Sequence, residues 1–408
     1  MKRHTLYIIM LLTSLSLQAQ TKMRIWQAGE DTKVSLAEAG VMTFNGLSLT
    51  IADQSYALST IDSLIFIPQV TVTYEGNTAS VSIPPSVAMD VTAEVNGADV
   101  TLTNRNVSNE CEFILSGSST NGSLTYIGEY KATFILDGLN LTSTTGAPLN
   151  IQCGKRIGME LKEGTTSTLA DVAGGQHKAC LYCRGHLEIE GAGNLQVTGN
   201  TNHAIGTKEY LQLKKTTGQI TILKAANDAV HAGQYFQMNG GTLTFDANTA
   251  ADGIQAEAIL LDDDLTPDPT KELNGQIIIK GGTIKGTVVN QDCKAMKCES
   301  TITISGGTLT LTAQGNGSRG IQTDGDMTIG EAAGSTTLID IKATGARCTL
   351  DECSEDPHRC MGIKVDGNLT VTGGTTNVSN TGSKSRGIKV GGTYSNTGGT
   401  VNATITTN

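Results

Sequence analysis

The sequence predicts an all-β chain, a right-handed parallel β-helix solenoid of about nine or more coils preceded by a small β module. A four-residue pattern of small, aliphatic, polar and small or apolar residues recurs nine times between residues 148 and 390. Its aliphatic positions, from Leu149 to Ile388, are separated by 32, 24, 25, 24, 42, 25, 42 and 25 residues. The unit is therefore 24 or 25 residues, and each gap of 42 contains a 17-residue insert. Units this short bury their apolar faces only by stacking on one another.

Each unit has room for three short strands and no helix. Within residues 362–387, alternating segments at 363–365, 369–372 and 375–378 are strand candidates, and Gly-Gly-Thr corners recur in five units at residues 240–242, 281–283, 306–308, 373–375 and 398–400. Crossovers between parallel strands are right-handed in nearly all folds. At about 4.8 Å per coil, nine coils form a rod of roughly 40 Å.

The chain begins with features of a secretory signal. Lys2 and Arg3 precede an apolar stretch at residues 6–12, and Ala19 ends a cleavage-like motif before Gln20. Residues 1–19 are therefore expected to be a signal peptide, and no later apolar run has the roughly 20 residues that a membrane helix requires. We expect a secreted protein, extracellular, at the cell surface or in the periplasm, that is not inserted in a membrane.

The rest of the chain divides by pattern. Residues 20–68 lack the repeat and are expected to form the small N-terminal β module, residues 69–110 to lead into and cap the solenoid, and residues 111–408 to form the β-helix domain. The net charge of −10 argues against nucleic acid as a partner.

The nine cysteines indicate disulfides in an oxidising compartment. Cys348, Cys353 and Cys360 lie in or beside the second insert with His358, where a loop disulfide is favoured over zinc. Because nine is odd, at least one thiol is free or pairs between chains.

A string of motifs in the solenoid resembles a known family. Residues 112–117 (Glu-Phe-Ile-Leu-Ser-Gly), 133–141 (Thr-Phe-Ile-Leu-Asp-Gly-Leu-Asn-Leu), 161–165 and 227–231 follow one another in the order found in bacterial secreted carbohydrate-binding proteins with a pectate-lyase-like right-handed parallel β-helix. The resemblance covers about residues 110–400. It implies calcium bound along the rungs and affinity for plant polysaccharides such as cellulose or polygalacturonate, the backbone of pectin.

Two acidic residues stand next to each other in the column two positions before the repeated aliphatic residue. Asp228 and Asp252 fall on neighbouring rungs, where carboxylates ~4.8 Å apart repel by about 3 to 4 kcal/mol at an effective dielectric of 20. A calcium ion, which takes six to eight oxygen ligands, would neutralise them. The candidate ligands for Ca²⁺ are Asp228, Asp252, Glu257 and Asp292. The alternative is a salt-bridged ladder in which His203 and Lys294, on the adjacent rungs, pair with the two aspartates.

The column directly after each aliphatic residue points outward, because side chains alternate along a strand. Its members form a polar stripe: Asn150, Tyr182, Gly206, His231, Gln255, Lys297, Gln322, Lys364 and Lys389. Such a row could hydrogen-bond successive sugars of a linear glycan, and its lysines would favour uronates. We therefore take as candidate carbohydrate-binding residues Tyr182, His231, Gln255, Lys297, Gln322, Lys364 and Lys389, together with Tyr235 as a further aromatic platform. The alternative is an ordinary solvated face.

These observations predict a secreted, noncatalytic carbohydrate-binding protein that recognises a plant-type or other linear polysaccharide along one face of the β-helix, with calcium assisting. One alternative is a calcium-dependent, pectate-type polysaccharide lyase, in which Lys294 or Lys297 would be the base beside the aspartates. The other is a surface adhesin. No motif places a base beside a metal, so catalysis is not expected.

Overall fold

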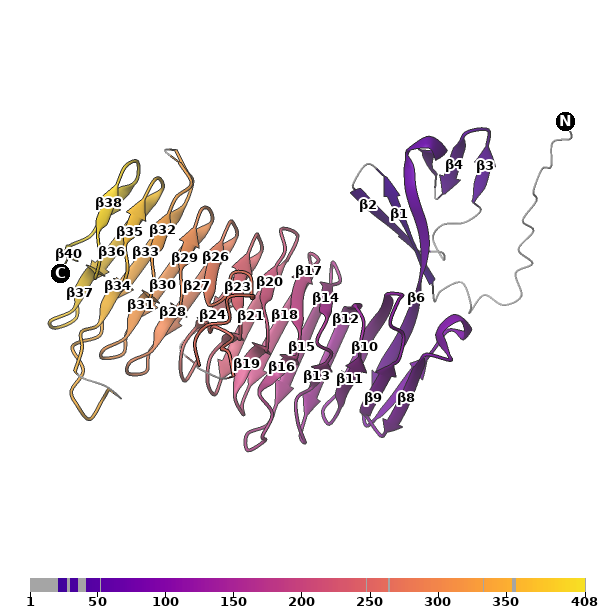
Figure 1. The fold of residues 1–408 in the computed structure, drawn as a ribbon. Coiled ribbons are helices and arrows are strands. Elements are labelled where there is room, and N and C mark those ends of the chain that lie inside the picture. The colour runs from indigo at the N-terminus through magenta and orange to yellow at the C-terminus, as the bar shows by residue number, and fades with distance from the viewer. Residues whose placement is uncertain are drawn as a thin grey trace, which may run out of the picture.

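A computed structural model of the chain describes residues 21–27, 30–35, 42–51, 53–246, 248–262, 265–332, 334–353 and 357–407. The signal peptide expected at residues 1–19 lies outside this part of the chain. The described residues form 40 strands and two short 3-10 helices, η1 (Leu58–Thr60) and η2 (Pro85–Val87). Most strands are parallel and stack coil upon coil in one direction (Figure 1). The predicted fold class, a parallel β-helix, is confirmed.

The solenoid has three faces, each a ladder of strands in register. Face 1 is a 13-stranded sheet: β8 (Val91–Asn96), β9 (Asp99–Asn104), β11 (Ser123–Gly128), β13 (Leu149–Gln152), β16 (Ala179–Cys183), β19 (His203–Thr207), β22 (Val230–Ala232), β25 (Ile254–Ala256), β28 (Lys294–Cys298), β31 (Arg319–Thr323), β34 (Met361–Val365), β37 (Arg386–Val390) and β40 (Ile405–Thr407). Only its first pair, β8 and β9, is antiparallel.

Faces 2 and 3 complete each coil. Face 2 contains β10 (Cys111–Ser119), β12 (Ala132–Ser143), β14 (Arg156–Leu161), β17 (His186–Glu190), β20 (Leu211–Leu213), β23 (Tyr235–Met238), β26 (Gln276–Ile279), β29 (Ile302–Ile304), β32 (Met327–Ile329), β35 (Leu369–Val371) and β38 (Tyr394–Asn396). Face 3 contains β15 (Thr166–Asp171), β18 (Asn194–Gly199), β21 (Gln219–Ala225), β24 (Thr242–Phe245), β27 (Thr283–Val288), β30 (Thr308–Ala313), β33 (Leu338–Ala343), β36 (Thr375–Asn380) and β39 (Thr400–Asn402). The long strand β12 pairs with both β14 and β15 and so belongs to both faces. The three strands expected in residues 362–387 correspond to β34, β35 and β36.

The N-terminal strands form a smaller unit at one end of the rod (Figure 1). They are β1 (Thr21–Gln27), β2 (Glu30–Ser35), β3 (Thr43–Asn45), β4 (Ser48–Ile51), β5 (Gln54–Ala57), β6 (Ile61–Glu75) and β7 (Thr78–Ser82). The first part of β6 pairs with β1, whereas its second part pairs with β7 and with β10 of the solenoid. Strands β1, β4 and β5 share a core of their own, formed by Met23, Ile25, Leu49, Ile51 and Tyr56, whereas β7 packs against the core of the solenoid. The boundary expected at residues 68 and 69 thus falls inside one continuous strand, which joins the unit to the solenoid.

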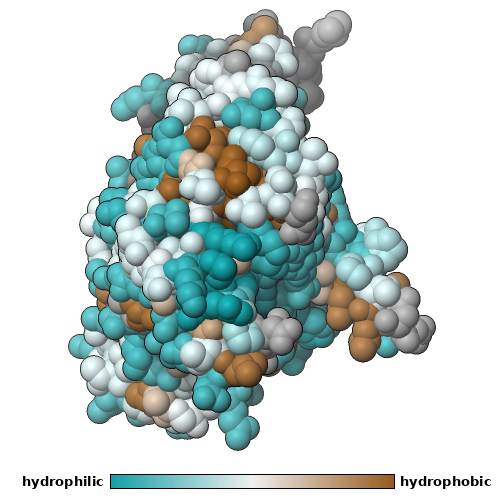
Figure 2. Space-filling model, turned by 90° about the vertical axis from the view of Figure 1, so that its left-hand side faces the viewer, coloured by the Kyte–Doolittle hydropathy of each residue, from teal (hydrophilic) through white to brown (hydrophobic). Residues whose placement is uncertain are grey.

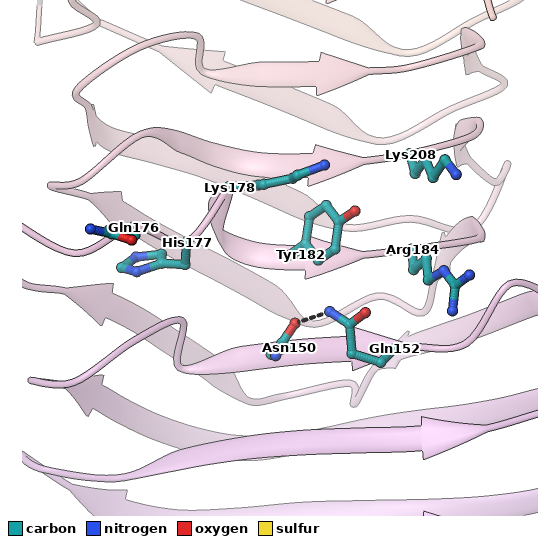
Figure 3. A pocket seen from close by; sticks show the side chains of 8 residues that line it. All are labelled: Asn150, Gln152, Gln176, His177, Lys178, Tyr182, Arg184 and Lys208. Atoms are coloured by element: carbon teal, nitrogen blue, oxygen red, sulfur yellow. Dashed lines mark hydrogen bonds between the residues drawn. The ribbon is translucent and has the colours of Figure 1, made fainter. Parts of the chain in front are cut away.

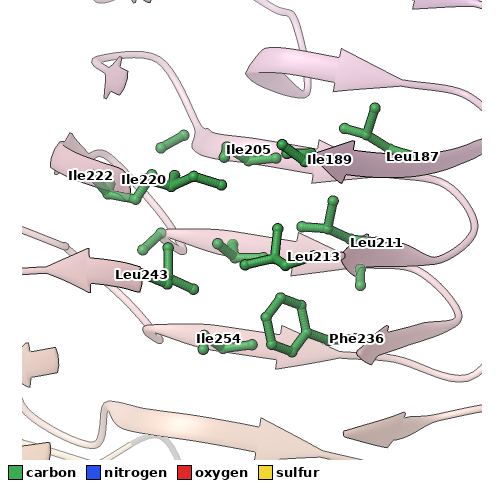
Figure 4. Close-up of a cluster of buried hydrophobic side chains, with 14 of the residues drawn as sticks. Leu187, Ile189, Ile205, Leu211, Leu213, Ile220, Ile222, Phe236, Leu243 and Ile254 are labelled. Atoms are coloured by element: carbon green, nitrogen blue, oxygen red, sulfur yellow. The ribbon is translucent and has the colours of Figure 1, made fainter. Parts of the chain in front are cut away.

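The repeated aliphatic residue forms a continuous column inside the solenoid. From Leu149 to Ile388, the nine residues at this position are aligned strand to strand, and none is more than 1 % exposed. Faces 2 and 3 add their own inward rows, such as Leu187, Leu211 and Phe236 (Figure 4). Each fully buried aliphatic side chain stabilises the fold by about 1.5–3 kcal/mol. The repeated aliphatic residues therefore stabilise the stacking of one coil on the next.

The last coil is less well covered than those before it. Tyr394, Val401, Ala403 and Ile405 pack against the core but remain partly exposed. Figure 2 views this C-terminal end and shows apolar patches among polar ones. Among the described residues, no helix has the length and apolarity that crossing a membrane would require.

The Gly-Gly-Thr corners are explained by close approach between coils. The second glycine has a positive φ in four of them, for example +85° at Gly307. A Cβ atom on Gly307 would lie 2.7 Å from the carbonyl oxygen of Gly282 in the previous coil. Any other residue would be strained by both the backbone conformation and the contact.

We expect Gly307→Ala to lower the free energy of unfolding by about 1–3 kcal/mol, since the left-handed conformation alone costs about 1–2 kcal/mol in an L-residue. Urea denaturation followed by far-UV circular dichroism measures the change. Gly154→Ala is the matched control, because a Cβ there meets nothing within 4 Å. Equal stability of the two variants would contradict this account of the corners.

Candidate functional site

The polar stripe predicted from the repeat lies in one column on face 1. Asn150, Tyr182, Gly206, His231, Gln255, Lys297, Gln322, Lys364 and Lys389 are partners in successive strand pairs from β13 to β37. Seven of the eight candidate carbohydrate-binding residues therefore share this column.

Tyr235 lies elsewhere. It begins β23 on face 2, and its ring stacks on Tyr210 with centroids 4.6 Å apart. Tyr210 stacks in turn on His186 at 4.3 Å, and its hydroxyl donates a hydrogen bond to Glu188 at 2.8 Å. Tyr235 thus belongs to an aromatic ladder in which neighbouring rings cover one another, separate from the stripe.

A pocket of about 390 Å³ opens at the N-terminal part of the stripe (Figure 3). It is lined by Asn150, Gln152, Gln176, His177, Lys178, Tyr182, Arg184 and Lys208. Tyr182 lies at its centre, between the rung of Asn150 and Gln152 and the rung of Lys208. The Tyr182 side chain is largely covered, at 9 % exposure, and the Lys178 ammonium stands 5.8 Å from its ring centroid.

The pocket has a cationic character. Lys178, Arg184 and Lys208 contribute ammonium and guanidinium groups, and no lining residue is acidic. Carboxylates form short, charge-assisted hydrogen bonds with such groups. The pocket therefore suits a ligand that combines hydroxyl groups with negative charge.

Sequence reasoning identified only Tyr182 and Asn150 among these lining residues. Gln176, His177 and Lys178 come from the extra residues that lengthen the first interval of the repeat, between Leu149 and Leu181, to 32 residues. His177 is anchored by Asp171, whose carboxylate lies 2.5 Å from Nε2. The irregular spacing of the repeat could have indicated the pocket, because an enlarged loop beside a regular stripe creates a concave surface.

Farther along the stripe, the polar groups hold one another. Gln255 donates to Glu257 at 2.7 Å, and Lys364 donates to Asp366 at 2.6 Å. Gln322 accepts a hydrogen bond from Arg319 and is only 8 % exposed. A glycan on this part of the stripe would have to replace these contacts, whereas the pocket offers more open groups.

Of the candidate metal ligands, Asp228 is the most constrained. Its Oδ2 lies 3.1 Å from Nδ1 of His203 and 3.2 Å from Nδ1 of His231, and its Oδ1 accepts the backbone N–H of Asp252 at 3.0 Å. Burial opposes ionisation of Asp228, but the hydrogen bonds and charges of the two histidines outweigh it and lower its pKa to about 2. Burial disfavours the charged form of His231, but the hydrogen bond that it donates to Asp228 and the charge of Glu257 outweigh burial and raise its pKa.

Asp252 has the opposite environment. It is 7 % exposed, and burial raises its pKa to about 6 despite the nearby Lys294. Its Oδ1 accepts the backbone N–H of Lys294 at 2.7 Å, while the Lys294 ammonium lies 3.1 Å from Asp292. Neighbouring rungs thus carry one aspartate whose pKa is lowered and one whose pKa is raised, so Asp252 takes up a proton at a higher pH than Asp228 does.

Asp292 and Glu257 are directed to other partners. Asp292 Oδ1 lies 2.8 Å from His358 Nε2 and 3.9 Å from Arg319 Nη1, in addition to its contact with Lys294. Glu257 Oε2 lies 3.5 Å from Nε2 of His231. The salt-bridged alternative expected His203 to pair with Asp228 and Lys294 to pair with Asp252. His203 does contact Asp228, whereas the Lys294 ammonium contacts Asp292 and only the Lys294 backbone N–H contacts Asp252.

The four carboxylates do not gather around a common point. In the described ranges, the groups of three metal-binding side chains with converging ligand atoms are His203, Asp228 and His231, and Cys348, Cys353 and His358. Neither offers the set of oxygens that calcium takes. Cys348 and Cys353 form a disulfide, the loop disulfide favoured for the second insert. The calcium site stays a prediction, because the described residues do not bring the four candidate carboxylates together as one set of ligands.

Comparison with known proteins supports the resemblance. The model of a family described as carbohydrate-binding domain-containing proteins matches residues 96–408. A curated protein of that description from Acetivibrio thermocellus is 36 % identical over 120 residues, which are 27 % of this chain and 41 % of the relative, so the chain matches about two fifths of that protein's length.

A solved structure shows the same fold. It is described as a polysaccharide lyase-like protein from C. thermocellum, as a gadolinium derivative, and superposes with a TM-score of 0.53 at 22 % identity, over 66 % of this chain and 99 % of that one. The family match covers most of the chain, including the solenoid from β9 to its last strand. This chain belongs to the carbohydrate-binding domain family.

Proposed function

We propose that this chain is a secreted, noncatalytic protein that binds an acidic linear polysaccharide, such as polygalacturonate, along the stripe of face 1 and in the pocket around Tyr182. The observation that carries the proposal is the pocket itself, in which three cations surround an aromatic side chain on the stripe. The stripe continues beyond it at about 4.8 Å per rung. A linear polymer can therefore be held at several points, while a neutral chain such as cellulose would use fewer of them. Calcium assistance remains part of the proposal.

The noncatalytic assignment rests on the surroundings of the candidate base. Lyase chemistry requires a base beside the cation that neutralises the uronate carboxylate. The Lys294 ammonium, one of the two candidate bases, is engaged by Asp292 at 3.1 Å. This contact favours binding over cleavage.

Affinity electrophoresis against cellulose, pectin and polygalacturonate, with calcium and with a chelator, tests the proposal. The change is a double substitution, Arg184→Gln with Lys208→Gln, which removes two cations from the pocket rim. Because charge contacts of exposed groups such as these contribute about 0.2–1 kcal/mol each, we expect affinity for polygalacturonate to fall about 2- to 30-fold.

Lys285→Gln with Lys342→Gln is the matched control, since it removes the same charge from exposed positions on face 3. An equal loss of affinity in both double variants would show that polygalacturonate is attracted by the overall charge of the protein and not bound at the pocket. Formation of unsaturated uronates, followed by ultraviolet absorbance, would identify a lyase. No retardation on any purified glycan would favour the adhesin alternative.

A further inference from the structure

Three side chains with metal-binding atoms converge on face 1, beside the stripe. They are His203 at the start of β19, Asp228 two residues before β22, and His231 within β22 and on the stripe itself. Their side chains are 12 %, 5 % and 19 % exposed. The group is therefore shielded on most sides but reachable from solvent.

The spacing of the ligand atoms fits a shared ion. Ligand bonds of about 2.0–2.1 Å in a tetrahedral zinc site separate neighbouring ligand atoms by about 3.3–3.4 Å. Asp228 Oδ2 lies 3.1 Å and 3.2 Å from the two imidazole Nδ1 atoms. Two imidazoles and one carboxylate are donors suited to zinc and other late first-row divalent ions, whereas calcium requires six to eight oxygens.

A second set of contacts orients these ligands. The backbone N–H of Asp252 donates to Asp228 Oδ1 at 3.0 Å, which leaves Oδ2 directed at the histidines. Glu257 Oε2 lies 3.5 Å from Nε2 of His231, the side of the ring that points away from Asp228. Carboxylates placed behind metal-binding histidines in this way orient the ring and raise its basicity. Two of the acidic residues expected to bind calcium, Asp228 and Glu257, thus acquire different roles, one as ligand and one as support.

The two rings must move to share an ion. Their centroids are 4.3 Å apart with planes inclined by 23°, so the rings stack instead of facing a common point, and an ion would displace any proton on Nδ1. Rotation about the Cβ–Cγ bonds would turn them toward a common point. The competing contact at His203 Nδ1 is weak, since the backbone N–H of Asp228 lies 3.4 Å away.

From these contacts we propose that His203, Asp228 and His231 bind one zinc-type divalent cation, with a fourth coordination position open toward the stripe. That position is available to water or to an oxygen of a glycan held on face 1. The site shares no lining residue with the pocket around Tyr182, and its existence does not rest on the proposed function.

Titration of the full chain, treated with chelator and kept non-reducing, tests this proposal without any glycan present. Zn²⁺ is titrated by calorimetry and Co²⁺ by its visible absorption, which is intense when coordination is tetrahedral. We expect one ion per chain. His203→Ala and His231→Ala should each weaken binding at least about 100-fold, and Glu257→Gln should weaken it about 10-fold, as loss of a supporting carboxylate typically does.

His186→Ala is the matched control, because His186 also pairs with a glutamate, Glu209, but lies on face 2. Circular dichroism checks that the variants fold, and proton–nitrogen NMR of the unaltered chain should show Zn²⁺ shifting the Nδ1 resonances of two histidines. Absence of binding, unchanged affinity in both ligand variants, or displacement of Zn²⁺ by equimolar Ca²⁺ would overturn the proposal.

Discussion

The Phe245→Ala variant should lose about 3–5 kcal/mol of its free energy of unfolding, the usual range for removing a buried phenylalanine. Phe245 ends β24 and is 1 % exposed. Its ring occupies space left by two glycines, Gly286 on the neighbouring strand β27 and Gly253 directly before β25. A Cβ on Gly286 would lie 2.1 Å from ring atom Cζ, and a Cβ on Gly253 would lie 2.3 Å from Cε2. The ring and the two glycines therefore form one interlocked packing unit, and its loss leaves a cavity between coils.

Urea denaturation followed by circular dichroism measures this change, and a double-mutant cycle isolates the contact. Gly286→Ala alone should cost about 1–3 kcal/mol, because the added methyl displaces the ring. In a Phe245→Leu background the same substitution should cost less, since the smaller side chain leaves room. Strictly additive effects would mean that the two positions do not touch.

The Asp252→Asn variant should be more stable than the natural chain at pH 8, by about 3 kcal/mol, and about equally stable at pH 4. Burial raises the pKa of Asp252 from 3.8 to about 6. Between these values the folded chain retains a proton that the unfolded chain has lost, so stability falls as pH rises through this window. A difference of about 2 pKa units corresponds to about 3 kcal/mol. Asparagine cannot ionise and avoids this loss, while its side-chain oxygen can still accept the N–H of Lys294.

The comparison is made by urea denaturation at both pH values in the presence of chelator, and is then repeated with calcium. Asp228→Asn is the contrasting variant, because the low pKa of Asp228 means that its ionised form stabilises the fold above about pH 4. It should be less stable than the natural chain at pH 8. Lower stability of Asp252→Asn at pH 8 in calcium, but not in chelator, would show that Asp252 binds calcium and would support the site predicted from the sequence.

The repeat allowed the fold and the stripe to be predicted from the sequence alone. A residue such as Lys297 could be placed beside Gln255 and Gln322 because parallel strands in a solenoid keep the same register from coil to coil. Tyr235 falls outside the repeated pattern, and the structure places it on another face. Spacing therefore predicts position only where the period holds.

The contacts of the charged residues could not be predicted in the same way. Asp292 pairs with His358, which lies 66 residues later in the second insert. Arg184 and Lys208 reach the pocket from the ends of their strands, where no alternation fixes side-chain direction. The repeat did predict that Asp228 and Asp252 lie on neighbouring rungs. Their opposite pKa shifts could not be predicted, because they depend on which of the two carboxylates contacts the histidines.

The crystal structure of the chain with an oligogalacturonate tests the central claim most directly. The account predicts sugar residues on face 1 across β13, β16 and β19, with a uronate carboxylate against Arg184 or Lys208 and the chain running along the stripe toward His231. A ligand bound only to face 2, face 3 or the N-terminal strands would contradict it.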